Sequence, residues 1–474
     1  MTLTHITYDR LQITPFEVVS IQELHMTKRL NEHTRLSFTA ILPEELQDSY
    51  VQLIEADSPV CVSQLDEAGT PTPLFNGTVL HMEVKVVRDV YYLEVEAISH
   101  TYKLDIRKKN GSFQDKNMKV EELLRAVGAD YPGFDIIDSA TGGATLGRIA
   151  VQYRETDWEF LKRIASRYHT SLTPASVFDV PKCYFGVEET QSGLDLTNYH
   201  YTVSKRVGDY RYFNGNDTAH VNEHDFIDYR VEAEQVLELG STVTFKGKNL
   251  YVYKVDTHMQ KGMMQHVYTL TSHKGLRHQE VFNEQLIGLS LPGKVIQVER
   301  DRIKLHLHID AAQDPAKAHW FTYVSPYTAE GHSGWYVMPE LGDTVLLYFP
   351  THREEEGMAS TSLREKNRSA GQHALAHPDI KLFRTAHGKE IKLTPDEIVI
   401  TSKEGTMYIQ LNEKNGIHIV SDKQIQFSAG GNISLHSGSK VKITAGDEIK
   451  MMSKGSTVSL GGITNVLGSE VKTN

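Results

Sequence analysis

The C-terminal part of the chain carries a repeat that restricts its fold more than any other feature of the sequence. Pairs of apolar residues around one polar residue recur every eight residues from 417 to 451, and the last pair follows after nine. Gly430, Gly438 and Gly446 keep the same step, three residues before a pair. Alternation with a period of two predicts a strand with one buried face. Glycine adopts the positive φ that turns between strands can require. Each octad is therefore one strand and one corner, which is typical of a β-helix. The apolar positions, which we expect to form the core of a needle, are Ile417, Ile419, Ile425, Phe427, Ile433, Leu435, Val441, Ile443, Ile449, Met451, Val458 and Leu460.

One octad supplies only one side of a β-helix, so other strands must close the cross-section. Either three successive octads of one chain form a coil, or three chains each contribute one side. Six octads give a single chain only two coils, which is few for a solenoid that must stack to bury its core. The octads are also nearly interchangeable, which favours three intertwined chains. An exposed antiparallel meander would favour Asn-Gly turns, and only Asn415-Gly416 fits.

The rest of the chain is long enough for about two further domains. Residues 1–285 are rich in strand-like segments and contain two predicted helices, one near 118–127 and one that begins at Thr156. Thr156 and Glu159 have the spacing of a capping box. Residues 286–363 alternate short strands with glycine and proline, which predicts a small closed barrel. We interpret residues 364–380 as a linker and residues 381–474 as the needle.

Composition excludes several classes of protein. The formal net charge of −11 argues against a nucleic-acid partner, which would require a basic surface. Two cysteines are too few for a disulfide scaffold. The N-terminal residues have no basic segment followed by an apolar one, so we expect cytoplasmic synthesis without a signal peptide. No apolar run approaches the ~20 residues that a membrane helix needs.

Motifs for catalysis are weak. The segment "GHSGW" (331–335) misses the spacing of a nucleophile elbow, and "GSTVTFKGKN" (240–249) misses that of a phosphate loop. His306 and His308 would share one strand face, but no third metal ligand is evident, and solvated histidines explain them better. We therefore expect no enzymatic activity, no cofactor and no metal. A carbohydrate-active or carbohydrate-binding β-helix protein stays open as an alternative function.

The order of these parts resembles a known family. The segment "VQYRETDWEFLKRIASRYH" (151–169) resembles the signature of VgrG spike proteins and phage late-control D proteins. The segment "PELGDTVLLYF" (339–349) is similar to part of their oligonucleotide/oligosaccharide-binding (OB) barrel, and the octads resemble the needle of contractile-tail spikes. The positions that match the signature are Gln152, Tyr153, Arg154, Glu155, Asp157, Phe160, Leu161 and Arg163.

The resemblance implies a mostly β homotrimer at the tip of a contractile injection machine. Its hub of two tube-like β-barrels with short helices would join a hexameric tube to an OB barrel and a triple-stranded β-helical needle. The implied partners are the tube protein hexamer, baseplate proteins, a PAAR-like tip protein or an effector at the needle end, and transiently the target envelope. We expect neither a lysozyme-like insertion between barrel and needle nor a C-terminal effector domain, so the resemblance does not imply enzymatic activity. The signature residues are expected to be structural, and the type of machine stays open among phage tail, bacteriocin-like particle, type VI system and extracellular injection system.

Overall fold

The computed structural model forms two compact units, Met1–Lys366 and Asn367–Asn474. Most of the predicted linker 364–380 and the end of the predicted needle lie outside the described residues. The predicted boundaries at 285 and 363 stay predictions. The described residues are 6–7, 10–46, 49–55, 58–66, 68–196, 200–216, 220–260, 262–326, 334–363, 379–403, 405–460, 463 and 470.

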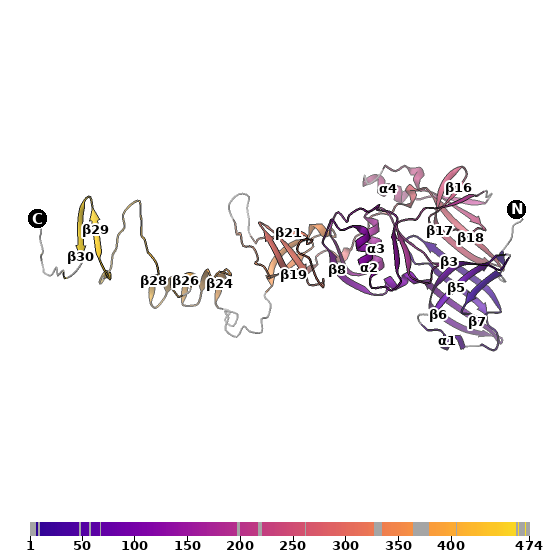
Figure 1. Cartoon of the computed structure of the whole chain (residues 1–474), viewed down its shortest axis with the longest axis horizontal. Coiled ribbons are helices and arrows are strands. Elements are labelled where there is room, and N and C mark those ends of the chain that lie inside the picture. The colour runs from indigo at the N-terminus through magenta and orange to yellow at the C-terminus, as the bar shows by residue number, and fades with distance from the viewer. Residues whose placement is uncertain are drawn as a thin grey trace. The chain divides into compact units, whose positions relative to one another are not determined.

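A 13-stranded sheet forms the N-terminal part of the first unit (Figure 1). Its two halves are joined where β17 pairs antiparallel with β3, with Lys254 opposite Arg29 and Met259 opposite Leu24. The expectation that this part of the chain is mostly β with short helices is therefore confirmed, and its strands form the two halves of one 13-stranded sheet where two tube-like β-barrels were expected. The strands are β1 (Ile6–Thr7), β2 (Leu11–Thr14), β3 (Ser20–Arg29), β4 (Arg35–Ile41), β5 (Pro59–Leu65), β6 (Pro71–Val87), β7 (Val90–Ser99), β13 (Thr190–Leu196), β14 (Tyr201–Lys205), β15 (Ile227–Ala233), β16 (Ser241–Phe245), β17 (Lys248–Gln260) and β18 (Met263–Thr271).

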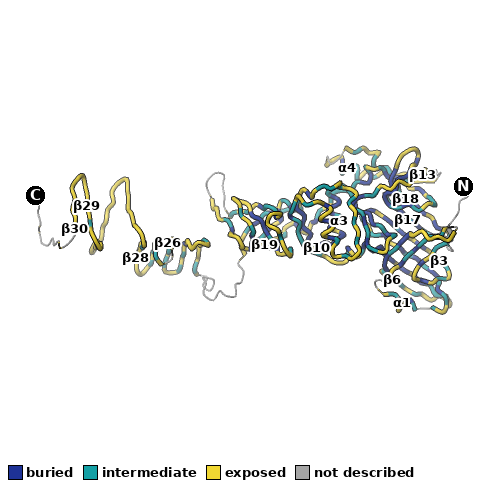
Figure 2. The backbone as a smooth tube through the Cα atoms, viewed as in Figure 1, coloured by how far each residue is buried: buried dark blue, intermediate teal, exposed yellow. Residues whose placement is uncertain are grey.

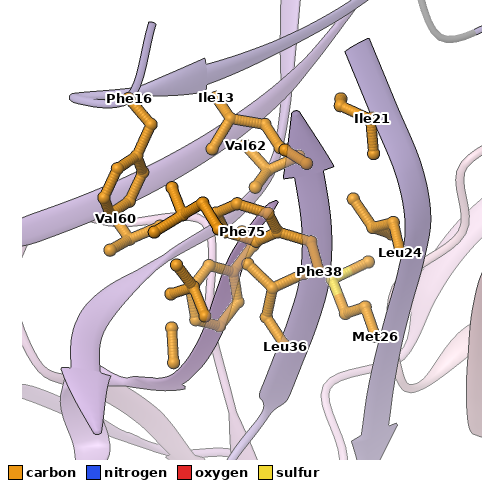
Figure 3. Packing of buried hydrophobic residues seen from close by; sticks show 14 of the residues in the cluster. Ile13, Phe16, Ile21, Leu24, Met26, Leu36, Phe38, Val60, Val62 and Phe75 are labelled. Atoms are coloured by element: carbon orange, nitrogen blue, oxygen red, sulfur yellow. The ribbon is translucent and has the colours of Figure 1, made fainter. Parts of the chain in front are cut away.

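Each half of this sheet has its own hydrophobic core. In β4, Leu36, Phe38 and Ala40 are buried and alternate with more exposed polar residues, as a strand with one core face requires. Figure 3 shows Leu36 and Phe38 packed with residues of the neighbouring strands, such as Phe75. The second core gathers the apolar residues of β13 and β15–β18. Short helices accompany the sheet: α1 (Ser49–Leu53), α4 (Val207–Gly215), and the 3₁₀ turns Glu223–Phe226 and Lys274–Leu276.

A third region lies between the two halves in sequence and contains both predicted helices. The helix expected near 118–127 is α2. The predicted capping box at the start of α3 is confirmed, because the Thr156 hydroxyl accepts from Glu159 N at 3.1 Å and Thr156 N donates to Glu159 Oε2 at 2.9 Å. The elements are the 3₁₀ turn His100–Asp105, β8 (Lys108–Phe113), α2 (Val120–Gly128), β9 (Asp135–Asp138), β10 (Ala150–Thr156), α3 (Asp157–Ser166), β11 (Leu172–Pro174) and β12 (Lys182–Phe185).

The predicted small barrel is confirmed as five strands that close in the order β19-β20-β21-β23-β22. Ile303, Leu305 and Leu307 on β20 are fully buried inside it. Its core also contains Ile149 and Val151, which belong to the region of β10. The elements are the 3₁₀ turn Glu284–Leu286, β19 (Ser290–Glu299), β20 (Arg302–Leu307), β21 (Trp320–Tyr323), β22 (Thr344–Tyr348), the 3₁₀ turn Glu354–Glu356 and β23 (Met358–Leu363).

The second unit contains a five-stranded antiparallel sheet in chain order and a separate hairpin (Figure 1). Residues 381–421 therefore form a meander within one chain, in which Gly388 takes φ 74° at a turn. Of the octads, only the pair Ile417 and Ile419 lies in this meander, so the triple-stranded β-helix predicted for the octads stays a prediction. The elements are β24 (Lys381–Arg384), β25 (Glu390–Leu393), β26 (Glu397–Lys403), β27 (Met407–Asn412), β28 (Gly416–Ser421), β29 (Ile449–Ser453) and β30 (Ser456–Leu460).

Burial differs strongly between the units when each is considered by itself. The strands of the first unit are buried on their core faces, whereas the described residues of the second unit are exposed or half-buried, apart from Glu390 (Figure 2). In the described part of the chain, no helix has the length and apolar character to cross a membrane.

Candidate functional site

The signature residues come together where the third region meets the barrel. All of them belong to β10 or α3, and they make two polar clusters and one apolar contact. We call this region, with the barrel residues that contact it, the junction. Phe160 and Leu161 supply the apolar contact: both are fully buried in the core of the third region, and Phe160 stacks on Phe113 at 5.6 Å.

The first polar cluster is a buried ion-pair network around Arg163. Its Nε and Nη2 atoms each donate to one oxygen of Glu155 at 2.7 Å, in a bidentate pair. Its Nη1 donates to Glu354 Oε1 at 2.6 Å, and Nη2 also donates to the carbonyl oxygen of Val151 at 2.9 Å. Arg167 donates to the same Glu354 oxygen at 2.8 Å. Because Glu354 belongs to the barrel, the network fastens the barrel to α3.

Charge pairing outweighs burial at Glu354. Burial by itself would raise the pKa of this carboxyl, but the Arg163 and Arg167 guanidiniums hold the pKa below its usual value. The carboxylate therefore stays ionised at neutral pH. Removal of one partner from such a buried network leaves an uncompensated charge, which is strongly destabilising.

The second polar cluster surrounds Asp157 at the start of α3. One oxygen of this buried carboxylate accepts from Gln152 Nε2 at 2.9 Å, and the other accepts from Lys109 Nζ at 2.5 Å and from the Tyr131 hydroxyl at 2.6 Å. Burial, and then the hydrogen bond to Asp157, raises the pKa of Tyr131 to about 12. A carboxylate in the first turn of a helix also faces the positive end of the helix dipole. The cluster therefore fixes the strand-to-helix turn.

Tyr153 and Arg154 mark a β-bulge between these clusters. The pairing of β10 with β8 shifts between Tyr153 and Glu155, and Arg154 has φ 51° at the extra position. Arg154 N donates to Asn110 Oδ1 at 2.8 Å, which holds this conformation. Tyr153 packs against the barrel core, and its carbonyl oxygen accepts from Asn283 Nδ2 at 2.9 Å.

A further contact, between the end of β8 and the barrel, has no counterpart among the sequence motifs. Ser112 N and its hydroxyl donate to the two oxygens of Asp310, at 2.6 Å and 2.5 Å. Gln114 Nε2 donates to the Leu305 carbonyl oxygen at 3.1 Å. Burial raises the pKa of Asp310, against the lowering effect of these hydrogen bonds. These partners are about 200 residues apart, and such distant pairs have no local sequence signal.

The second candidate surface is the apolar face of the meander in the second unit. Strand register places apolar residues directly opposite one another across four or five strands, and we call these two rows the apolar ladders. The first ladder is Phe383, Ile391, Ile400, Ile409 and Ile419, and the second is Leu393, Ile398, Leu411 and Ile417. Their exposed fractions in the single chain range from 40% to 69%.

The predicted needle-core residues are also exposed in the single chain. Ile417 and Ile419 lie on β28, and the last two pairs lie on β29 and β30. The pairs from Ile425 to Ile443 lie outside the described strands. Phe427 and Leu435 are 72% and 74% exposed. Ile449 is half-buried, and the side chain of Leu460 lies outside the described part.

The described residues contain no group of three or more His, Cys, Asp and Glu side chains that could hold a metal ion. His306 Nε2 lies 3.0 Å from the Asp310 carbonyl oxygen, so a backbone group occupies one nitrogen of the candidate pair. His308 is exposed. The polar geometry of the first unit is therefore suited to holding its parts together.

Comparisons with known proteins agree with this architecture. Residues 291–363 match the family described as the type VI secretion system/phage-baseplate injector OB domain. No curated protein has a matching sequence. The E. coli c3393 protein, a type VI secretion component described as similar in structure to T4 bacteriophage tail proteins gp27 and gp5, is 14% identical with a TM-score of 0.53. The match covers 75% of this chain and 99% of that protein.

Two further structures match over most of the chain. A chain of the half-lidded Francisella PdpA–VgrG complex is 10% identical, with a TM-score of 0.53, and the match covers 86% of this chain and 87% of its own. A chain of the lidless PdpA–VgrG complex is 9% identical, with a TM-score of 0.53 and coverage of 84% and 93%. These matches support the fold that the signature residues implied. The chain therefore shares the fold of the type VI secretion component and of chains in the PdpA–VgrG complexes, and its barrel is similar to the injector OB domain.

Proposed function

We propose that this protein is the structural spike at the tip of a contractile injection machine, where it joins the tube to the tip and pierces the target envelope. The observation that carries the proposal is the injector-type OB domain, set in a chain whose fold resembles type VI secretion components and phage tail proteins. The junction fits a mechanical role. A barrel fastened by buried ion pairs and a shared core transmits force to the hub without a hinge.

The apolar ladders support assembly as a homotrimer. A soluble protein rarely exposes a continuous apolar face of this size unless a partner covers it. Successive octads carry the same pattern, so identical chains can cover one another in register. In this proposal, the apolar positions of three chains face a common axis and the polar positions between them face water.

Light scattering of the purified full-length chain tests the assembly directly. We expect a mass three times the 53.5 kDa of one chain. A stable monomer at micromolar concentration would contradict the trimer. A trimer that persists after removal of residues 381–474 would show that the main association lies in the hub and that the needle is not required for it.

The partners follow from the same proposal. The hub contacts the hexameric tube protein and baseplate proteins, and a PAAR-like tip protein or an effector binds near residues 461–474, most of which lie outside the described part of the chain. Deletion of residues 462–474 should leave trimers intact but abolish retention of the tip protein on assembled particles. Particles that keep the tip protein after this deletion would contradict that binding site.

Penetration in this proposal is mechanical and requires no catalysis by the spike itself. The purified protein is therefore expected not to cleave peptidoglycan or other polysaccharides. Release of soluble sugars that a point mutation in one carboxylate abolishes would replace the proposal with the carbohydrate-active alternative.

A further inference from the structure

A cavity of about 610 Å³ lies within the first unit, between the 13-stranded sheet and α3. Its walls come from the turn after β3, from α3, from β17 and from the segment near 278–281. The bulge of β17 between Val252 and Lys254 lies at one wall and contributes Tyr253 and Lys254. None of the signature residues lines this cavity, so it is distinct from the junction.

The lining of the cavity is cationic in a chain whose formal net charge is −11. Arg29, Lys162 and Lys254 face one acidic lining residue, Glu32. Arg29 and Glu32 are 3.7 Å apart, and both are largely exposed. Such a surface ion pair contributes little to the stability of the fold. Lys254 pairs with Asp256 at 2.6 Å, whereas no described carboxylate lies within ion-pair distance of Lys162, which acts on Asp105 only through a longer-range electrostatic interaction. Lys162 is therefore the cation of this lining without an ion pair among the described residues.

Hydrogen bonds between different segments hold the walls in place. Leu172 N donates to Asn31 Oδ1 at 2.8 Å, which ties the turn after β3 to the third region. Val281 N donates to Ser166 Oγ at 2.8 Å, and His278 N donates to the His169 carbonyl oxygen at 3.0 Å. A site whose walls are fixed before binding loses less conformational entropy when it is filled.

The chemistry of the lining distinguishes among anionic ligands. Phosphate sites commonly use arginine forks or the backbone N–H groups of a helix N-terminus. Here α3 contributes Lys162 and Ser166, from its middle and its end, and the only arginine already faces Glu32. Apolar Leu30 and Val281 and the ring of Tyr253 also line the cavity. A lining that combines cations with apolar surface fits carboxylate side chains with their methylene stems.

We propose that this cavity binds an acidic segment of a partner protein, with one carboxylate on Lys162, a second on Lys254 beside its existing partner Asp256, and the stems on the apolar wall. The proposal does not depend on trimer formation. It would give the hub a docking point for an acidic cargo or baseplate segment.

Fluorescence anisotropy on the full-length protein at low salt tests the proposal. The probe is a labelled hexaglutamate peptide, and hexaglutamine is the neutral comparison. We expect hexaglutamate to bind and hexaglutamine not to bind. Lys162→Glu should weaken hexaglutamate binding at least ~10-fold, because one attractive contact becomes repulsive. The matched control is Lys85→Glu, which reverses an exposed lysine on β6 outside the cavity and should leave binding unchanged.

Lys162→Met provides a second variant that keeps the stem and removes only the charge. It should also weaken binding, with an unchanged circular dichroism spectrum. Equal binding by wild type and both Lys162 variants would overturn the proposal, as would equal binding of hexaglutamine. Displacement of hexaglutamate by an equal concentration of inorganic phosphate would also overturn it, because the cavity would then be a small-anion site.

Discussion

Two isoleucines, one in each unit of this chain, differ strongly in how far they are buried. Ile303 in the OB barrel is 0% exposed, whereas Ile417 at the start of the octads is 69% exposed. Both lie on antiparallel strands and pair with an apolar residue directly opposite, Val298 for Ile303 and Leu411 for Ile417. The barrel closes on itself and supplies its own cover, but the meander is one layer and leaves its ladders uncovered in a single chain.

The comparison separates two requirements that usually coincide. Backbone pairing satisfies the N–H and C=O groups of a strand whether or not its apolar face is buried. Burial of that face supplies most of the favourable free energy of folding. The first unit meets both requirements within one chain, and in our proposal the second unit meets the burial requirement only after association.

The largest expected effect comes from charge placed on the apolar side of an octad. Ile433→Asp would bring three carboxylates close to one axis, where desolvation and mutual repulsion both penalise them. We expect the needle to fail to assemble, with loss of its cooperative thermal transition in calorimetry. Ser434→Asp, one residue later, would face water and serve as the matched control. Equal loss of stability in the two variants would show that the assigned register is wrong.

The next effect concerns the junction in the first unit. Arg163→Ala would leave Glu155 and Glu354 buried without their shared partner, and we expect it to lower the free energy of unfolding by about 3–5 kcal/mol. Urea denaturation of the full-length chain, followed by tryptophan fluorescence, measures this loss. Arg353→Ala removes an exposed pair with Glu355 and should cost less than about 1 kcal/mol. Similar losses for the two arginines would mean that the buried network does not fasten the barrel.

A matched pair of truncations compares burial in the two units. Leu305→Ala should destabilise the barrel by about 2–5 kcal/mol whatever the oligomeric state, because the side chain is fully buried. Ile409→Ala, at 40% exposure, should cost less than about 1 kcal/mol in a chain kept from assembling by Ile433→Asp. In the assembled protein its cost should approach that of Leu305→Ala. An Ile409→Ala cost that is independent of assembly would contradict the proposed cover of the ladders.

The smallest effect is a dependence on pH. The pKa of Glu354 is lower in the folded chain than its ordinary value of 4.5, so its ion pairs stabilise the fold above that pH. Their contribution should disappear as the pH falls below 4.5 and through the lower folded pKa. The difference in melting temperature between wild type and Glu354→Gln should therefore be largest near pH 7 and shrink towards pH 3. A difference that is constant over this range would exclude Glu354 ionisation as its source.

Local signals explain what the sequence could predict. The capping box needs only Thr156 and Glu159, and the barrel follows from regular short strands. The junction depends on pairs such as Arg163 with Glu354, which are 191 residues apart and have no periodicity. The cavity around Lys162 likewise requires four separate segments to meet.

The shared core of the junction limits how this protein can be recombined. Ile149 and Val151 pack inside the barrel core although they precede the barrel by more than 130 residues. In a chimera that exchanged only residues 286–363 for the barrel of a relative, Ile149 and Val151 of this chain would have to pack into the core of a foreign barrel. Exchange of the barrel between related chains is therefore expected to succeed when residues 149–156, which include β10, are transferred with it.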